Sequence, residues 1–191
     1  MRFFKLILFY YFLTILANFY HVCPVIAQDN SPPLLYNTNI FWRDEADVLK
    51  KINISILSAE NAKEYFMPGK LWTVVARRGE IEIKAAVLYK GIAVFAIHFD
   101  PINGSLLPCG VHPPVYHKIS SLIINKIKEN LSCIVKELKI LKGAEFRERE
   151  NCWVIPIVYH EIIVAHLKVY RDGIHIIPDY KAEQEMKTFT N

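Results

Sequence analysis

Residues 85–108 read AAVLYKGIAVFAIHFDPINGSLLP, and residues 153–178, about 70 positions later, read WVIPIVYHEIIVAHLKVYRDGIHIIP. Similar residues fall at matching positions when the two stretches are laid together. The matching pairs are Tyr89 with Tyr159, Ile92 with Ile162, Val94 with Val164, Ile97 with Leu167, Phe99 with Val169 and Pro108 with Pro178. A supersecondary unit that occurs twice predicts a duplicated scaffold, and it favours a function carried by the surface of that scaffold over a single catalytic cluster.

The first stretch belongs to a series of predicted strands rich in β-branched and aromatic residues. These runs cover 71–76, 80–89, 92–99 and, after a turn, 105–108. Glycines in the intervening pairs Arg78-Gly79 and Lys90-Gly91 allow the positive φ angles of tight hairpins. Within 80–84, charged and apolar residues alternate, so we expect one face of the sheet to be in water and the other to cover a helix.

Apolar residues at helical spacing precede each set of strands. The segment 44–66 is expected to be helical, with a break near Ser58 left open and an end at Pro68-Gly69, although Ile52, Ile54 and Ile56 also alternate as in a strand. The second helix shows the clearer stripe: Ile124, Ile127, Leu131, Ile134, Val135 and Leu138. Strands are then expected near 144–149, 152–159, 162–170 and 174–177.

These patterns predict an α+β fold of two repeated units, each a helix packed on an antiparallel β-meander. The proline-containing segment 110–117 forms a natural boundary between the units. The expected divisions are a signal peptide at 1–27, a linker at 28–43, a first unit at 44–109, a second unit at 118–180 and a polar tail at 181–191.

The N-terminus has the features of an export signal. Arg2 and Lys5 precede an uncharged apolar run that ends in Val25-Ile26-Ala27, which is typical of a secretory signal peptide cleaved after Ala27. The alternative is an uncleaved membrane anchor, since the apolar run is just long enough to span a bilayer. Removing 27 of the 191 residues leaves 164, enough for one domain or two small lobes. We therefore expect an exported protein, periplasmic or secreted.

Net charge argues against nucleic acid as the partner. The chain carries a formal +4, and loss of Arg2 and Lys5 leaves +2. A nucleic-acid binder normally presents a basic stripe that neutralises phosphates, and so small an excess does not supply one.

The ending of the first unit resembles that of the PepSY domain family, on the segment Phe99-Asp100-Pro101-Ile102-Asn103-Gly104-Ser105-Leu106-Leu107. The resemblance covers about 44–108 and, less well, 118–178, where the equivalent turn at 169–175 is expected to be shorter by about one residue and lacks the Asp-Pro start. What the resemblance implies is an exported, noncatalytic module that holds or inhibits a partner such as a peptidase, or senses a signal, at the cell envelope. A sheet backed by helices is compatible with this role, because it offers a face and edges for protein contact or for self-association.

Cysteine and histidine residues form one metal-like cluster. Cys109, His112 and His117 lie close in sequence, and a thiolate with two imidazoles could bind zinc or copper, although the spacing matches no standard finger. The alternative is an ordinary polar interdomain loop, which we favour. Of Cys109, Cys133 and Cys152 at most one pair can form a disulfide, and Cys133 on the apolar stripe of the second helix is expected to be a buried free thiol.

Catalytic signatures are weak. His166, Lys168 and Tyr170 are expected on a solvated sheet face, opposite a core face, and no carboxylate is placed by the sequence to orient His98, His160, His166 or His175. The chain has no Gly-x-Ser-x-Gly elbow and no glycine-rich phosphate loop. We therefore expect a noncatalytic protein without a cofactor that binds a protein partner. The alternatives are a small metal-binding protein using Cys109, His112 and His117, and a membrane-tethered structural protein.

Overall fold

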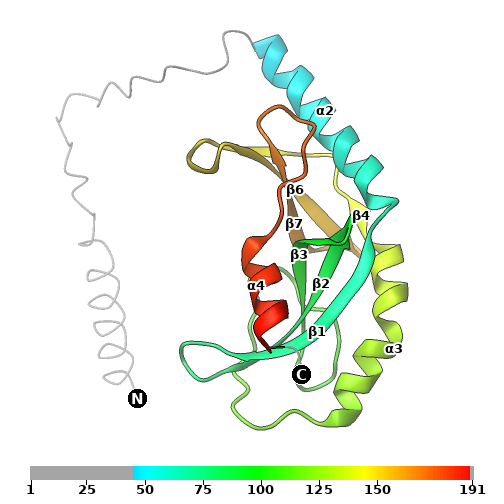
Figure 1. Cartoon of the computed structure of the whole chain (residues 1–191), viewed down its shortest axis with the longest axis vertical. Coiled ribbons are helices and arrows are strands. Elements are labelled where there is room, and N and C mark those ends of the chain that lie inside the picture. The colour runs from blue at the N-terminus through cyan, green and yellow to red at the C-terminus, as the bar shows by residue number, and fades with distance from the viewer. Residues whose placement is uncertain (1–44, 190–191) are drawn as a thin grey trace, which may run out of the picture. The chain divides into compact units, whose positions relative to one another are not determined.

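The computed structural model describes residues 45–189, which form an α+β fold with three α-helices and two antiparallel sheets (Figure 1). The signal peptide expected at 1–27 and the linker expected at 28–43 lie outside the described residues. Within the described part, no helix is both long enough and apolar enough to cross a membrane.

The first sheet has the strand order β1 (Met67–Val75), β2 (Ile81–Tyr89) and β3 (Ile92–Phe99), which confirms the three strands expected from the sequence. Lys90 and Gly91 have φ angles of 51° and 81°, as the tight turn between β2 and β3 requires. Pro68 and Gly69, expected to end the first helix, instead lie inside β1. A Cβ at position 69 would come within 2.8 Å of the Ala86 Cβ, so glycine there lets β1 cross closely over β2.

The second sheet is built around one central strand. β6 (Cys152–Tyr159) pairs with β7 (Ile162–Tyr170) along one edge and with two short strands along the other. The short strands are β4 (Lys139–Ile140), which the sequence did not predict, and β5 (Glu145–Arg147), followed by a 3-10 turn at Glu148–Glu150.

Hydrogen-bonding details of the first sheet recur 70 positions later in the second. The strand register shifts between Val87 and Leu88 in β2, and it shifts again between Ile157 and Val158 in β6. The turn after each last strand is closed in the same way. Asp100 N donates to Ser105 O at 2.8 Å, and Tyr170 N donates to His175 O at 2.7 Å. The second turn is therefore as long as the first, and the expected one-residue shortening is wrong.

Two helices precede the sheets in the chain and pack in an exchanged manner. α2 (Glu45–Lys63) is continuous through Ser58 and packs against β4, β6 and β7, whereas α3 (Ser121–Glu137) packs against β1 (Figure 1). A Cβ on Gly173, in the turn after β7, would lie 3.2 Å from Ile54 Cγ2 of α2. A Cβ on Gly104, in the turn after β3, would lie 3.3 Å from Ile127 Cγ1 of α3. Each helix thus contacts the sheet or the turn of the other half, which differs from the expected packing of each helix on its own meander.

One hydrophobic core joins the two sheets. Fully buried side chains of both belong to the same cluster, among them Ile83 and Phe99 from the first sheet and Trp153 and Leu167 from the second. The sheets themselves stay separate, and they meet where β3 lies beside β7.

Two backbone hydrogen bonds tie the halves together reciprocally. Cys109 N donates to Ile163 O, and Asp179 N donates to Ala93 O, both at 2.8 Å. The two donors are 70 positions apart in the chain, and so are the two acceptors. A pseudo-two-fold relation produces a junction of this kind.

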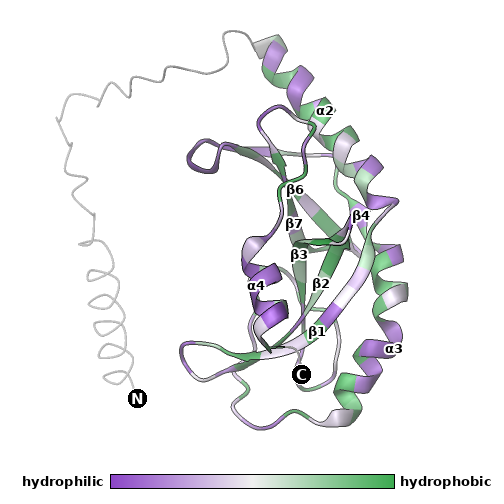
Figure 2. Cartoon of the chain, viewed as in Figure 1, coloured by the Kyte–Doolittle hydropathy of each residue, from purple (hydrophilic) through white to green (hydrophobic). Residues whose placement is uncertain are grey.

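The end of the chain differs from the polar tail expected at 181–191. Tyr180–Phe189 form helix α4, whose Ala182 and Met186 are buried against Trp72, Ala86 and Ala93 of the first sheet. α4 is mostly polar, as Figure 2 shows, so its narrow apolar stripe was easy to miss. Because α4 covers the sheet face that was expected to be in water, Lys84 is buried with 7 % exposure.

Candidate functional site

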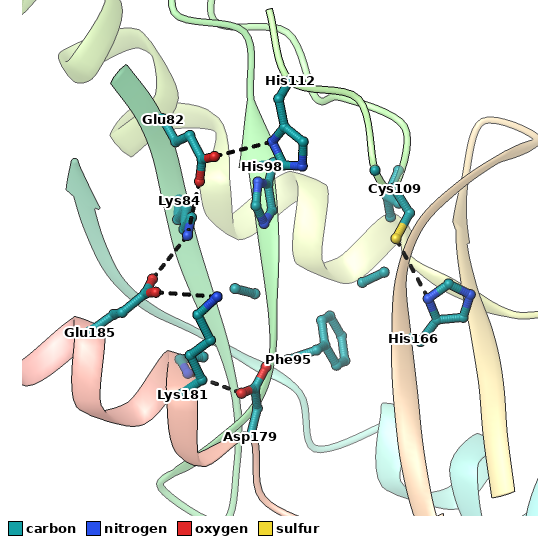
Figure 3. A pocket seen from close by; sticks show the side chains of 15 residues that line it. Glu82, Lys84, Phe95, His98, Cys109, His112, His166, Asp179, Lys181 and Glu185 are labelled. Carbon is teal, nitrogen blue, oxygen red and sulfur yellow. Dashed lines mark hydrogen bonds and ion pairs between the residues drawn. The ribbon is translucent and has the colours of Figure 1, made fainter. Parts of the chain in front are cut away.

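A polar hollow of about 440 Å³ lies where α4, the strands β3 and β7 and the loop after β3 come together (Figure 3). Its position follows from the fold, because β3 and β7 meet there and α4 closes one side. Nine ionisable or ligating side chains line it: Glu82, Lys84, His98, Cys109, His112, His166, Asp179, Lys181 and Glu185.

Lys84 is held between two carboxylates. Its Nζ lies 3.0 Å from Glu82 Oε2 and 3.0 Å from Glu185 Oε2, and Trp72 Nε1 donates to the same Glu185 oxygen at 3.3 Å. Burial disfavours the charged lysine, but the bonds to the two carboxylates outweigh it and raise the pKa of Lys84. Burial likewise acts to raise the pKa of Glu82, and Lys84 outweighs it and lowers that pKa. Lys84 and Glu82 therefore each stabilise the charged form of the other.

The second oxygen of Glu82 faces two imidazoles. Glu82 Oε1 lies 3.4 Å from His112 Nδ1, and the rings of His98 and His112 pack edge to face with their centroids 5.2 Å apart. One ligand atom from each of the three residues falls within 4.8 Å of the others. Among the described residues, this is the group of three or more His, Cys, Asp or Glu that is close enough to hold a metal ion.

His98, a member of this group, also has an unpaired polar atom. Its Nδ1 is buried and has no hydrogen-bond partner. Burial, reinforced by the charge of Lys84, lowers the pKa of His98 to about 4, so the ring is neutral at physiological pH. A neutral imidazole with a free nitrogen is a metal ligand by its chemistry, whereas a buried nitrogen left unpaired costs stability.

Cys109, His112 and His117, the metal-like cluster considered from the sequence, do not form one group in the structure. His112 joins Glu82 and His98, Cys109 Sγ lies instead 3.5 Å from His166 Nδ1, and His117 belongs to neither group. Closeness in sequence was misleading here, because β2 and β3 bring Glu82 and His98, which are farther away in the chain, to His112.

The contact between Cys109 and His166 is the nearest the hollow comes to a nucleophile and base. The backbone N–H of Cys109, which would be an oxyanion donor in acyl transfer, is already bonded to Ile163 O. Burial lowers the pKa of His166, with a further contribution from Arg147. Thiol-dependent acyl transfer requires a free N–H that can stabilise the oxyanion, and the N–H of Cys109 is not free for this role.

Two other histidines have acidic partners that the sequence did not reveal. His160 Nε2 lies 3.0 Å from Glu137 Oε2, and His175 Nδ1 lies 2.6 Å from Asp172 Oδ2. Both histidines are exposed, so these contacts lie at the surface, have small energetic value and are not buried dyads.

All three described cysteines are free thiols. Cys152 is buried, whereas Cys133 is exposed, so the expectation that Cys133 is buried on the apolar stripe is wrong. The buried face of α3 consists of Ile127, Leu131 and Val135, and Cys133 points away from it because it follows Leu131 by only two positions, about 200° around the helix.

A second surface feature lies beside β1. A groove of about 600 Å³ runs between the start of β1 and α3, and its charged lining residues are Lys70 and Lys128. Its apolar lining comes from Leu71 and Leu131. β1 is the outer strand of its sheet, and in the described part of the chain no strand pairs with its free edge.

The residues that sequence reasoning missed are Glu82, Lys84 and Glu185. The alternation at 80–84 did place Glu82 and Lys84 on one face, but that face was taken to be solvated. The spacing of Ala182 and Met186 is a helical signal that could have predicted a covering helix and, with it, Glu185.

Searches with the whole chain found no matching family model, no matching curated protein and no matching solved structure.

Proposed function

We propose that this chain is an exported, noncatalytic binding module of two repeated PepSY-like units, and that it engages an extended acidic segment of a protein partner along β1. The observation that carries the proposal is the free edge of β1 beside a groove lined by lysines. The resemblance of residues 99–107 to the PepSY ending supports the same class of function.

The recurrence of hydrogen bonds supports the repeated units. Register shifts, turn closures and the bonds that join the halves all repeat at an interval of 70 residues. Duplication of one unit accounts for this recurrence. Exchange of the helices α2 and α3 between the two copies then accounts for the single core, to which both copies contribute.

The edge of β1 supplies the main-chain part of recognition. β1 is nine residues long, and an added strand would satisfy its outward N–H and C=O groups as another strand of the sheet would. An added strand could also cover exposed side chains at the two ends of β1. These are Met67 and Val75, the first and last residues of the strand, and Tyr65, which precedes it.

Charge determines which segment fits. Lys70 and Lys128 line the groove, and Arg77 and Arg78 follow β1. A segment bearing Asp or Glu at alternate positions would place carboxylates near these cations. Two copies of β1 paired edge to edge would instead bring their own cations together, which disfavours self-association through this strand.

The residues of the hollow do not indicate a hydrolytic site, which would argue against a noncatalytic role. Cys109 and His166 are in contact, but the Cys109 N–H is committed to the junction between the halves. A noncatalytic role therefore remains the better account of these residues.

The test is a titration of the purified, isotope-labelled protein with two nine-residue peptides, one alternating Glu and Val and one alternating Lys and Val. We expect the acidic peptide to shift the amide resonances of 67–75 and to slow hydrogen exchange at the outward amides of β1. Equal binding of both peptides, or shifts confined to other strands, would contradict the proposal.

Charge-reversal variants give a matched control. Lys70→Glu and Lys128→Glu are expected to weaken binding of the acidic peptide, whereas Lys142→Glu, an exposed change outside the groove, is expected to leave it unaltered. Light scattering on the same proteins measures whether they self-associate. A dimer broken by Lys70→Glu would overturn the assignment of the edge to a partner.

A further inference from the structure

We propose that Glu82, His98 and His112 form a binding site for a divalent transition metal, with Zn²⁺ as the ion that fits the ligands best. The site lies in the polar hollow and uses neither β1 nor α3, so it is independent of the partner proposed above. It also differs from the cluster of Cys109, His112 and His117, with which it shares one residue.

The ligand set matches zinc chemistry. Two imidazoles and a carboxylate are the protein ligands of many catalytic zinc sites, where a fourth position stays open to water or substrate. Glu82 Oε1 and His112 Nδ1 are 3.4 Å apart. That separation is close to the edge of a tetrahedron, about 3.3 Å, for ligands about 2.0–2.1 Å from the ion. His98 needs only a small movement to complete the set, since its ligand atom is within 4.8 Å of both others.

The surroundings hold the carboxylate and balance its charge. Glu82 uses Oε2 to bind Lys84, which leaves Oε1 toward the imidazoles. Lys84 would repel a cation if it were alone, but Glu185 binds the same ammonium at 3.0 Å. Two carboxylates and one lysine give this cluster a net charge of −1, which attracts a cation. A carboxylate ligand that is itself hydrogen-bonded is the usual arrangement around protein metals.

Two further observations favour a ligand at this point. The buried Nδ1 of His98 has no hydrogen-bond partner in the folded chain, and an unexplained polar atom of this kind points to an ion or a water. The hollow of about 440 Å³ also gives access, and His112 is 43 % exposed at its rim. Because Glu82 and His98 stand on neighbouring strands and His112 on the loop after β3, a bound ion would fasten that loop to the sheet.

The experiment uses the purified protein stripped with a chelator and then titrated with Zn²⁺ by calorimetry, with Co²⁺ absorption as a second probe. We expect one equivalent of Zn²⁺, a rise in melting temperature that grows with free Zn²⁺, and a Co²⁺ spectrum of low-coordinate type. His98→Ala and His112→Ala should each weaken binding by more than about 100-fold, the upper cost of losing an outer-shell residue.

Two controls separate this site from the loop cluster. His117→Ala and Cys109→Ser are expected to bind Zn²⁺ as the unaltered protein does. His112 is exposed on a loop, so its alanine variant is expected to fold normally, and circular dichroism checks this. Absence of stoichiometric Zn²⁺, full binding by His98→Ala, or loss of binding in His117→Ala would each overturn the inference.

Discussion

Lys84 is the residue whose environment is most unusual, because a lysine with 8 % of its side chain exposed needs strong partners. Glu82 and Glu185 provide them, and their side chains are 17 % and 16 % exposed. We predict that Lys84→Met destabilises the protein by roughly 3 kcal/mol, because two largely covered carboxylates then lose the cation between them. Urea unfolding of the two proteins measures the difference.

Lys181 offers a matched control. It also approaches Glu185, at 3.8 Å, but its side chain is 82 % exposed. Lys181→Met should therefore cost less than about 0.5 kcal/mol. Similar costs for the two variants would show that burial does not strengthen the Lys84 pairs.

Glu183 makes stability depend on pH. Its Oε2 accepts a bond from Ala93 N at 3.0 Å, and this bond, with help from Lys187, lowers the pKa of Glu183 below its ordinary 4.5. Since the pKa is lower in the folded state, the contribution is complete above pH 4.5 and is lost as the pH falls through the folded value.

The pH prediction is read from urea midpoints. Glu183→Gln is expected to be less stable than the unaltered protein at neutral pH, and the gap should close as the pH falls below 4.5. Glu64→Gln, an exposed change just beyond α2, serves as the control and should show no such gap. A gap for Glu183→Gln that is constant across the pH range would contradict the assigned role.

At the scale of elements, α4 decides what the first sheet can do. Ala182 and Met186 bury one stripe on Trp72, and Glu183 and Glu185 bind the sheet on either side of that stripe. A helix of ten residues is marginal by itself, so its order depends on these contacts.

We predict that Met186→Asp detaches α4 and destabilises the fold by about 3 kcal/mol or more, because a charge would be buried among apolar groups. Amide hydrogen exchange should rise throughout 180–189, and Trp72 fluorescence should shift to the red. Gln184→Asp places the same charge on an exposed position of α4 and should change neither reading. Slow exchange in α4 of Met186→Asp would mean that other contacts hold the helix.

At the scale of the whole molecule, the exchanged helices make the halves depend on each other. Gly173 approaches α2 so closely that a Cβ would lie 3.2 Å from Ser55 Oγ and 3.3 Å from the Lys51 carbonyl oxygen. Gly91 has nearly the same φ, 81° against 82°, but open space around it. The two glycines therefore separate backbone strain from packing.

We predict that Gly91→Ala costs about 1 kcal/mol from the positive φ alone, whereas Gly173→Ala costs about 2 kcal/mol because α2 must also move. Denaturant unfolding of both variants gives the comparison. Equal costs would show that α2 yields freely at this turn and that the packing across the halves is loose.

Much of the fold could be predicted from the sequence, because the signals for most helices and strands lie within the element itself. Alternation and tight-turn residues identified β1, β2, β3, β6 and β7, and a 3.6-residue stripe identified α3, because these signals arise within one element. Prediction failed for α4, whose polar composition hid a stripe of two residues, and for Cys133, whose position on the helix was misjudged.

The candidate site was out of reach for the same physical reason. Sequence neighbours suggested His112 only as an alternative ligand beside Cys109 and His117, whereas the residues that lie near it, Glu82 and His98, come from β2 and β3. Glu185, which balances Lys84, lies about 100 positions after it in the chain. No pattern along one segment encodes such a meeting.

The amino-acid sequence by itself determined most of the strands and the helices α2 and α3, and it showed that the residue pattern of 85–108 is similar to that of 153–178. Only the tertiary structure decided that α2 and α3 pack across the halves, that one core serves both sheets, and that Lys84, Glu82 and His98 meet under α4. Secondary structure follows from short-range periodicity, whereas packing partners are selected by burial of surfaces contributed from distant parts of the chain.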